Sequence, residues 1–399
     1  MMEKTPGKSR GIIFYISMIG FLAIFTSTIS KNPVLPYLVK SLGAGDQVLG
    51  LISSISPIAG IVFSFPVGFL ADKIGKKKML IIASLIFLSA PLLYLLVTNA
   101  FWLIPVRFFH GMATAILGPL ASTIIAESYD SNRGEKLGVY SSATLIGRTL
   151  APLTGGVIIS YFAFYGELTS YRAVYVAAFL MSIPVVIGSF MVKTGETSVK
   201  KSVSVKEFFI SIKYIAGNKL ILATALVDLS TYFSFGIFET FTPGYLKNSG
   251  YRPEIVGLIF SLQILSIALT KPLFGRVADR IDKRIQIASG LFILGLSVAI
   301  IPFVTLFIPV LAVSMLFGLA MSFSTVATSA FVADVAEKEQ LGASMGALSS
   351  IMDVGHSSGP LVAGTVITLI SVKAGFLSGF ILALLVSAVF VIFAWGTKK

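Results

Sequence analysis

The sequence predicts an all-α membrane protein, with twelve transmembrane helices in two pseudo-symmetric six-helix bundles. The composition is 55% hydrophobic and only 12% charged, with a mean hydropathy of +0.91, whereas soluble domains are about 25% charged. Apolar runs of about 20 residues, the length that crosses a bilayer core, recur throughout the 399 residues. In addition, the segment 68–78 returns in similar form at 275–284, which indicates an internal duplication.

The apolar spans must be helices, because lipid cannot satisfy exposed backbone polar groups. The polar stretch after the sixth span divides the chain into an N-terminal bundle, 1–193, a cytoplasmic linker, 194–217, and a C-terminal bundle, 218–399. Inside the linker, residues 205–214 have the pattern of a short amphipathic helix on the membrane surface. The spans run near residues 12–38, 48–70, 79–97, 100–126, 137–162, 171–193, 218–241, 254–275, 285–305, 307–333, 342–370 and 374–396.

The net charge of +13 does not indicate nucleic-acid binding, because the basic residues lie in short links between apolar spans. Most of these residues fall in links on one side of the membrane. The positive-inside rule therefore places both termini and both repeated segments in the cytoplasm. No cleavable signal pattern precedes the first span. We expect a multi-pass protein of the cell membrane, inner or plasma, with the lipid bilayer as its surroundings and no nucleic-acid partner.

Cysteine is absent, which excludes disulfides and thiolate metal sites. The chain also contains no nucleotide-binding loop and no His-Glu-x-x-His motif. We therefore expect no cofactor, no metal site and no enzymatic activity.

The repeated segments carry the pattern that identifies a family. Gly68, Asp72 and Gly75, followed by three lysines, resemble the signature of the major facilitator superfamily between its helices 2 and 3. The copy that starts at Gly275 resembles the weaker repeat between helices 8 and 9, with Asp282 where a second glycine is expected. The resemblance covers the whole chain. It implies two six-helix bundles around a central cavity that opens alternately to each side of the membrane.

Two further stretches resemble signatures of the same superfamily. Arg107-Phe-Phe-His110-Gly is similar to the helix 4 motif of proton-coupled members, with His110 in place of the usual glutamine. The stretch from Gly147 to Gly156 is similar to the helix 5 motif of antiporters, with Ala151 in place of a glycine. The resemblance therefore implies a small-molecule substrate, protons as the coupling ion, and antiport, and we expect the protein to act as a monomer.

The resemblance also implies a gate at the cytoplasmic side, where charged helix ends of the two halves contact each other. Glu127 and Asp334 end the fourth and tenth spans at an offset of 207, next to the repeated segments. In the alternative interpretation, the lysines only determine topology and these two acids are solvated helix ends. The expected gate residues are Gly68, Asp72, Gly75, Lys76, Asp279, Glu127 and Asp334.

Glycine and proline recur at matching places in the fifth and eleventh spans. Proline bends a helix and glycine permits tight packing. Static packing is the alternative to flexing, and the two interpretations overlap. The residues expected to bend these helices are Gly147, Pro152, Gly155, Gly156, Gly355 and Pro360.

Charged residues inside the spans are few, and each costs several kcal/mol unless it is paired or faces water. At an offset of 208, Lys31 corresponds to Glu239 and Arg148 corresponds to His356. We hypothesise that Lys31 and Glu239 face each other in the outer part of the cavity and pair when that side closes. The alternative is that the two residues snorkel independently near helix ends.

Carboxylates at membrane depth are candidates for proton transfer, because perturbed titratable groups gather at functional sites. Asp228 and Asp353 lie deepest, and Glu239 is the third candidate. In the alternative interpretation, the aspartates form structural pairs with Arg148 or Arg107. The candidates for the substrate cavity are Lys31, Arg107, Arg148, His356, Tyr232 and Phe235.

The expected function is proton-coupled export of lipophilic or amphipathic small molecules, as in multidrug efflux. Lys31 gives the first span a basic residue and no acid, which also fits anionic or zwitterionic substrates. The alternative is therefore a metabolite, sugar, organic-anion or lipid transporter of the same fold. A receptor that binds ligand without moving it is a third interpretation.

Overall fold

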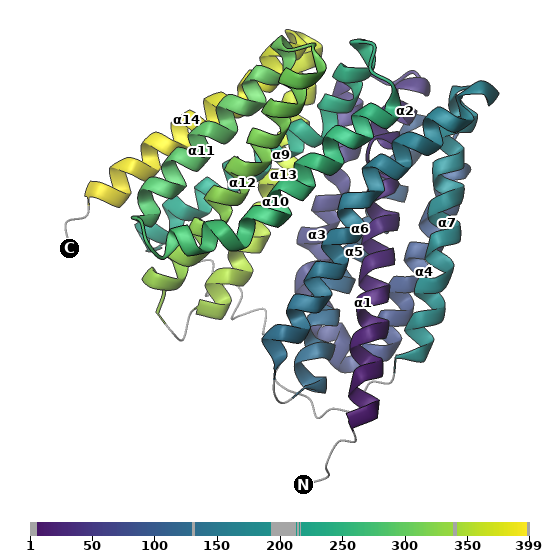
Figure 1. The fold of residues 1–399 in the computed structure, drawn as a ribbon, viewed down its shortest axis with the longest axis horizontal. Coiled ribbons are helices and arrows are strands. Elements are labelled where there is room, and N and C mark those ends of the chain that lie inside the picture. Colours follow the sequence, from purple (N-terminus) through teal and green to yellow (C-terminus); the bar gives the residue numbers. More distant parts are fainter. Residues whose placement is uncertain are drawn as a thin grey trace. The chain divides into compact units, whose positions relative to one another are not determined.

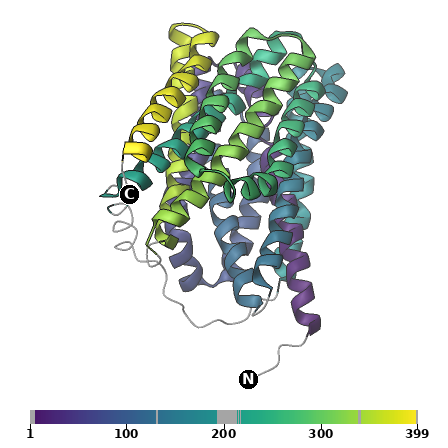
Figure 2. The same ribbon diagram turned by 60° about the vertical axis from the view of Figure 1, so that its left-hand side comes forward.

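The computed structural model describes residues 6–129, 132–192, 213, 215, 217–337 and 341–396. These residues form long α-helices joined by short turns, as Figures 1 and 2 show. Side chains outside the description are those of 6–10, 64–66, 68, 69, 72, 341–343, 347 and 396.

The helices follow one another with short connections in both halves of the sequence. The first half contains α1 (Pro6–Ile29), α2 (Val34–Ser41), α3 (Asp46–Ile74), α4 (Lys76–Leu95), α5 (Leu103–Ser128), α6 (Arg133–Phe162) and α7 (Glu167–Met191). The second half contains α9 (Lys219–Asn248), α10 (Pro253–Ala278), α11 (Lys283–Ile300), α12 (Phe307–Val335), α13 (Leu341–Leu369) and α14 (Val372–Gly396). Short 3-10 helices lie at Ala100–Trp102 (η1), Ala163–Tyr165 (η2) and Ile301–Phe303 (η3).

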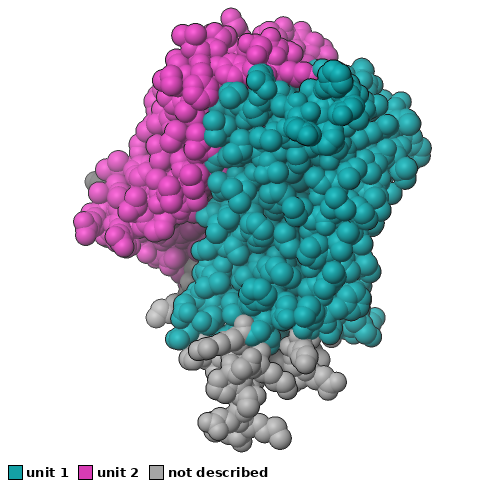
Figure 3. Space-filling view, turned by 45° about the vertical axis from the view of Figure 1, so that its right-hand side comes forward, with its two compact units in different colours: residues 1–43, 59–203, 252–261 teal, residues 44–58, 204–251, 262–399 magenta. Residues whose placement is uncertain are grey.

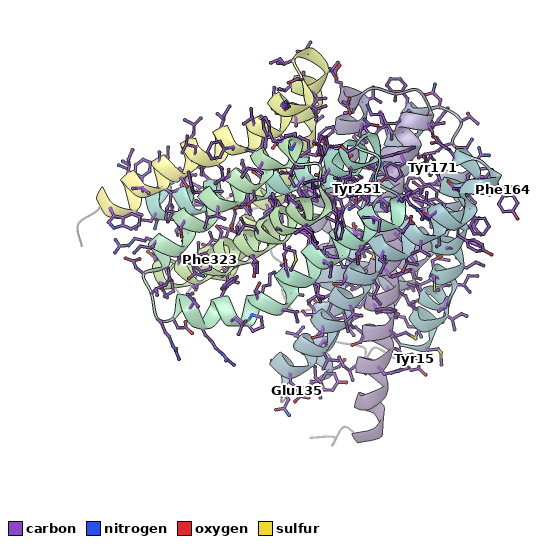
Figure 4. The ribbon with its side chains drawn as sticks, turned by 45° about the horizontal axis from the view of Figure 1, so that its top comes forward. Tyr15, Glu135, Phe164, Tyr171, Tyr251 and Phe323 are labelled. Atoms are coloured by element: carbon purple, nitrogen blue, oxygen red, sulfur yellow. The ribbon has the colours of Figure 1, made fainter. Side chains whose placement is uncertain are left out.

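Among the described residues, eleven helical segments are long and apolar enough to cross a membrane. The helix α13 is not one of them, but its 29 residues match the length of α3 and α12 and cover the predicted span 342–370. Large apolar side chains are exposed on many helices, and Figure 4 shows Phe164, in the 3-10 helix η2 that follows α6, pointing away from the helices. The predicted all-α membrane fold is therefore confirmed.

The first span differs from the prediction, because it is not one continuous helix. The helix α1 ends at Ile29 and α2 begins at Val34, so that Lys31 lies in the turn between them. Pro33 has no N–H to donate, and the residue before a proline disfavours helical backbone. The prediction placed Lys31 within a helix, and the structure places it at a helix break.

The chain forms two compact units, which Figure 3 colours separately. Unit 1 comprises residues 1–43, 59–203 and 252–261, and unit 2 comprises the remaining residues. The start of α3 thus packs in unit 2, and the start of α10 packs in unit 1. Most of the predicted linker lies outside the described residues, so its amphipathic helix at 205–214 and the division into two bundles stay predictions.

One close helix contact occurs in the same form in each unit. The helix α1 packs along α6, and α9 packs along α13 (Figure 1). A Cβ added at Gly147 would collide with the carbonyl oxygen of Phe21, and a Cβ added at Gly355 would collide with that of Leu229. Gly147 corresponds to Gly355, and Phe21 corresponds to Leu229, both at an offset of 208. Glycine lets the two backbones approach this closely, so the duplication is visible as an atomic contact.

A second duplicated contact involves the starts of α3 and α10. In unit 2, a Cβ added at Gly50 of α3 would collide with the carbonyl oxygen of Pro360 in α13. In unit 1, a Cβ added at Gly257 of α10 would collide with the carbonyl oxygen of Pro152 in α6. The helices α6 and α13 continue through these prolines. The two prolines therefore pack against the start of another helix, while their predicted bending role stays a prediction.

Serine hydroxyls make polar contacts one turn further along the same two helices. Ser54 Oγ of α3 donates to the carbonyl oxygen of Ser357 in α13 at 2.6 Å. Ser261 Oγ of α10 accepts the N–H of Leu153 in α6 at 3.1 Å. The two serines correspond at an offset of 207, so a serine at the same position makes a polar contact in each unit, although one donates and the other accepts.

The first turns of α3 and α10 make contacts that are equivalent in position but different in chemistry. In unit 2, the N–H of Gln47 donates to Thr368 Oγ1 at 3.1 Å. In unit 1, Ser160 Oγ donates to the carboxylate of Glu254, which also pairs with Arg252 at 2.6 Å. An uncharged contact in one copy thus corresponds to an ionic contact in the other.

The two repeated segments begin the helix that follows them in different ways. Gly75 precedes α4 with a φ of 98°, a left-handed value that glycine adopts without strain. Asp282 precedes α11 with a φ of −62°, and its carboxylate accepts the N–H of Arg284 at 2.9 Å. A carboxylate in this position satisfies a backbone N–H that has no partner inside the helix. The change from glycine to aspartate therefore accompanies a change of backbone conformation and a new helix cap.

We predict that Gly50→Ala and Gly257→Ala each lower the free energy of unfolding by about 1–3 kcal/mol, because the added methyl group must push two helix backbones apart. Gly118→Ala in α5 is the matched control, since an added Cβ meets no atom within 4 Å there. The measurement is thermal unfolding of the purified variants in detergent. Unchanged midpoints in both test variants would contradict the close contacts.

We predict that Asp282→Ala lowers the free energy of unfolding at pH 7 by about 1 kcal/mol, the usual effect of losing an N-cap. Hydrogen bonds from Arg284 hold the pKa of Asp282 below its ordinary value. The carboxylate therefore stabilises the fold at neutral pH, and this contribution is lost as the pH falls through that lowered pKa.

The difference in unfolding midpoint between the wild type and Asp282→Ala should accordingly shrink on acidification below about pH 4. Asp282→Asn is the control, because its amide oxygen keeps the cap without a titrating charge. A difference between wild type and Asp282→Ala that stays constant over this pH range would show that the carboxylate does not contribute as described.

Candidate functional site

A carboxylate and an imidazole contact each other between α9 and α13 in unit 2. Glu239 Oε2 lies 2.9 Å from His356 Nε2. The Glu239 side chain is 10% exposed and that of His356 is 19% exposed, so that solvent reaches both only in part. Two residues that the sequence analysis placed in different groups of candidates, proton coupling and substrate cavity, therefore form one polar pair.

Two aromatic candidates surround this pair. The ring centroid of Phe235 lies 5.3 Å from that of His356, and the ring centroid of Tyr232 lies 6.5 Å from it. Tyr232 and Phe235 also contact each other edge to face at 6.3 Å. With Glu239 they stand three and four residues apart on α9, which places all three side chains on one face of the helix.

Small residues at the α9–α13 contact explain how the two helices approach closely enough for this cluster. Gly355 lies against the carbonyl oxygen of Leu229, and Gly359 lies against that of Phe233. From the other side, Gly236 of α9 lies against the ring of Pro360. His356 is the residue after the first of these glycines, so the glycine contacts bring its ring to the aromatic face of α9.

The arrangement places an ionisable pair next to aromatic rings. A carboxylate and an imidazole in contact exchange a proton with little movement, and histidine titrates near neutral pH. The rings of Tyr232 and Phe235 offer apolar area and a π face, which attract lipophilic groups and cations. Among the described residues, no group of three or more His, Cys, Asp or Glu side chains comes together in a way that could hold a metal ion.

Asp228 lies in a different environment, inside unit 2 between α9 and α12. The residue is 0% exposed. Its Oδ1 accepts a hydrogen bond from Thr328 Oγ1 at 2.8 Å, while Oδ2 is buried with no hydrogen-bond partner among the described residues. The sequence analysis considered Arg148 or Arg107 as the partner of Asp228, but the structure gives a threonine hydroxyl. Asp353 lies in α13, three residues before His356, and is partly buried.

The helix 4 signature lies in the packed interior of unit 1. Arg107 is 2% exposed, and His110 is 1% exposed. Tyr94 and Tyr175 stack at 4.5 Å beside them, and Tyr94 Oη lies 3.4 Å from His110 Nδ1. The ring of Phe87 meets His110 edge to face at 5.9 Å. The described surroundings of Arg107 and His110 are thus aromatic side chains of the same unit.

The two other basic candidates belong to a different compact unit from the α9–α13 cluster. Lys31 is partly buried in the turn between α1 and α2, and Arg148 is exposed on α6. Both belong to unit 1, whereas Glu239 and His356 belong to unit 2. The hypothesis that Lys31 pairs with Glu239 therefore stays a prediction.

The repeated segments take part in two equivalent ion pairs. Lys76, at the start of α4, pairs with Glu127 at the end of α5 at 2.6 Å. Lys283, at the start of α11, pairs with Asp334 at the end of α12 at 2.8 Å. Lysine and acid both correspond at an offset of 207, so each unit closes one pair of helix ends with the same interaction. The lysines thus have a structural partner as well as their predicted role in topology.

The other expected gate residues are less well defined. Asp279 is exposed, and the side chains at Gly68 and Asp72 lie outside the description. The gating role of all these residues stays a prediction.

Several residues of the structure escaped the sequence analysis. Gly50, Gly257, Ser54 and Ser261 correspond at the same offset of 207 as the repeated segments, so the offset alone was a signal for them. Thr328 is a single hydroxyl in an apolar span and gave no such signal.

One short match to a hydrolase motif also needs its structural context. Residues 355–359 have the spacing Gly-x-Ser-x-Gly. The motif of serine hydrolases requires a sharp turn between a strand and a helix. Here the five residues lie inside the continuous helix α13, so Ser357 is not placed as a nucleophile.

The chain is similar over most of its length to several membrane transporters. It is 24% identical over 90% of its length to an uncharacterized MFS-type transporter of Methanocaldococcus jannaschii, covering 92% of that protein. It is 29% identical to the multi-drug resistance efflux pump PmrA of Streptococcus pneumoniae over 62% of each chain. It is 23% identical to the multidrug resistance protein 2 of Bacillus subtilis, over 91% of this chain and 90% of that one.

Solved structures share the fold. A bacterial homolog of the human lysosomal transporter Spinster matches with a TM-score of 0.77 and 13% identity, over 98% of this chain and 96% of that one. The nucleoside transporter NupG matches with a TM-score of 0.78 and 16% identity, over 97% and 100% of the two chains. The family model of the Major Facilitator Superfamily matches residues 16–252 and 225–399. The chain therefore belongs to the Major Facilitator Superfamily of membrane transporters.

Proposed function

We propose that this transporter is a secondary active exporter of lipophilic or amphipathic small molecules. It exchanges them for protons by alternating access across the cell membrane, with both termini in the cytoplasm. The observation that carries the proposal is the contact of Glu239 with His356 beside the rings of Tyr232 and Phe235. This cluster puts a proton-binding pair and an aromatic surface at one place.

The cluster supports antiport because proton and substrate would compete for the same carboxylate. Ionised Glu239 attracts a cationic group of the substrate, while the neighbouring rings contact its apolar part. A proton on Glu239 removes that attraction and favours release of the substrate. The substrate thus favours the ionised form of Glu239, and the proton favours the neutral form. Each ligand therefore displaces the other, which is the condition for exchange.

Several relatives support the substrate class. PmrA and the multidrug resistance protein 2 of Bacillus subtilis carry names of drug transporters, and the second is similar over nine tenths of the chain. In both, the name describes that protein, and we extend it to this chain as part of the proposal.

The alternative is a transporter of metabolites, sugars, organic anions or lipids. It rests on Lys31, which is partly buried at the α1–α2 break. Arg107 offers less support for it, since its described neighbours are aromatic side chains inside unit 1. A lysine carries a positive charge, which attracts an anionic group of a substrate.

We predict that Glu239→Gln abolishes the acceleration of transport by an imposed pH gradient. The variant should retain substrate exchange without a gradient, at reduced affinity for cations, because the amide keeps the shape of the site and its aromatic contacts but carries no charge and cannot bind a proton. The measurement is transport of lipophilic cations in proteoliposomes with and without the gradient.

The matched control for this experiment is Glu135→Gln. Glu135 lies in the first turn of α6, and its side chain is 59% exposed and pairs with its neighbour Lys136. Gradient-driven transport that survives in Glu239→Gln would remove Glu239 from the coupling mechanism. If Asp228→Asn and Asp353→Asn retained it as well, proton coupling at these carboxylates would be wrong.

We predict that Lys31→Glu leaves the transport of lipophilic cations in place or increases it, because it replaces a repelling charge by an attracting one. Uptake and exchange of matched cationic and anionic probes in the same proteoliposomes provide the comparison. Lys40→Glu, at an exposed position of α2, makes the same change of charge as a control. Selective loss of anion transport in Lys31→Glu would favour the alternative substrate class.

A further inference from the structure

The hydroxyl of Thr328 lies between two oxygen atoms inside unit 2. Its Oγ1 is 2.8 Å from Asp228 Oδ1 and 3.0 Å from the carbonyl oxygen of Thr325, one turn earlier in α12. Asp228 and Thr328 are both 0% exposed. A threonine hydroxyl carries one hydrogen, so it donates to only one of these two acceptors at a time.

Each of the two acceptors fits one charge state of Asp228. When Asp228 is ionised, the hydroxyl donates to Oδ1 and supplies the carboxylate with a hydrogen bond. When Asp228 is protonated on Oδ1, the carboxyl group donates to the threonine oxygen, and the hydroxyl turns to donate to the carbonyl of Thr325. Proton uptake forms one O–H bond on Asp228, and Thr328 keeps its own proton throughout.

The second carboxyl oxygen makes this arrangement selective. Asp228 Oδ2 is buried and has no hydrogen-bond partner among the described residues. A proton on Oδ2 would leave a buried O–H donor without an acceptor, which is costly. A proton on Oδ1 leaves Oδ2 as a carbonyl oxygen, and an unpaired acceptor is tolerated better than an unpaired donor. Thr328 therefore directs the proton to Oδ1.

Apart from Asp353, the charged groups on the described parts of the helices packed against α9 have contacts elsewhere. The helices packed against α9 are α11, α12, α13 and α14. On their described parts, the charged side chains with contacts elsewhere are Lys283 with Asp334, Arg284 with Asp282, His356 with Glu239, and Lys373 with the ring of Phe303. Asp353 of α13 is the remaining carboxylate on these parts, and the hydrogen-bond partner that the structure gives Asp228 is Thr328.

We propose that Thr328 is the positioning residue of a proton site at Asp228, because its hydroxyl provides a hydrogen bond to both the ionised and the protonated carboxyl group. The proposal rests on the proton coupling proposed above, and it adds a second proton site to the Glu239–His356 pair. A carboxyl group that is hydrogen-bonded in both states changes its charge without rearrangement of the helices around it. Such a group suits repeated proton uptake and release in an apolar interior.

Difference infrared spectroscopy on the purified, reconstituted protein tests the proposal directly. The carbonyl stretch of a protonated carboxyl group appears in a separate spectral region, and it moves to higher wavenumber when the group loses a hydrogen-bond partner. Asp228→Asn and Asp353→Asn assign the bands, because each removes one of them. We expect Thr328→Val to move the Asp228 band to higher wavenumber, and Thr328→Ser to leave it in place.

Thr224→Val is the matched control for the loss of a buried hydroxyl. Thr224 lies one turn before Asp228 on α9, is 0% exposed, and donates to the carbonyl oxygen of Leu220 at 2.8 Å. Its substitution should destabilise the protein about as much as Thr328→Val without moving the Asp228 band. Should Thr328→Val fail to fold, Thr328→Cys replaces it, and the thiol, a weaker acceptor than a hydroxyl, should move the band less but in the same direction.

Transport measurements on the same variants connect the site to coupling. We expect Thr328→Val to reduce gradient-driven transport about tenfold, the effect of losing one hydrogen bond to a charged group, while exchange without a gradient continues. Thr328→Ser and Thr224→Val should behave like the wild type.

The outcomes separate the two proposals. If Asp228→Asn removes a titrating band and gradient-driven transport, but Thr328→Val changes neither, the role of Thr328 is overturned and proton coupling stands. If Asp228→Asn removes no titrating band, the proton site itself is wrong. If the wild type shows no response to a pH gradient while the Asp228 band still moves in Thr328→Val, the positioning role stands and the proposed coupling falls.

Discussion

The arrangement of the candidate site depends on glycines that face carbonyl oxygens of a neighbouring helix. Gly355 and Gly359 bring α13 against α9, and Gly147 brings α6 against α1 in the equivalent way. A side chain at any of these positions would force the backbones apart, and packed helices resist such changes. Only at this separation does the ring of His356 reach Glu239 and the aromatic side chains of α9. The proposed proton chemistry and substrate contact therefore rest on a contact between backbones, which involves no charge.

The duplication is preserved in packing and has diverged in chemistry. The glycine contacts, the serine contacts at the starts of α3 and α10, and the two lysine–acid pairs all repeat at offsets of 207 or 208. At the same offset, however, Glu239 and His356 correspond to Lys31 and Arg148. Packing tolerates little change, because each contact has a partner of fixed shape. The side chains proposed to contact substrate or protons differ between the two copies.

Sequence reasoning reached the spans and the family because hydropathy and short motifs are local properties of the chain. It could not tell which candidates lie inside a bundle, since a helix that is apolar all round carries no sign of the direction its polar residues face. Arg107 is an example: the structure buries it next to Tyr94 in unit 1, and its predicted place in the cavity stays a prediction. For the same reason, Thr328 could not be predicted from the sequence. Tyr232, Phe235 and Glu239, in contrast, could be grouped from the sequence, because they follow helical spacing on α9. The break at Lys31 was also readable from Pro33, but the apolar run around it suggested one helix.

The proposed alternating access makes different demands on the two kinds of duplicated contact. The α1–α6 and α9–α13 contacts join helices from the same half of the sequence and hold the candidate residues in place, so they must persist through the cycle. The contacts of α3 with α13 and of α10 with α6 join helices from different halves, and they must separate when the halves move. At these places the glycines are accompanied by hydroxyls and by the carboxylate of Glu254. Water satisfies such polar groups after separation at little cost in free energy, whereas the α1–α6 and α9–α13 contacts would expose packed apolar surface on parting. The chain thus has polar contacts at the places where the proposed movement requires two helices to part.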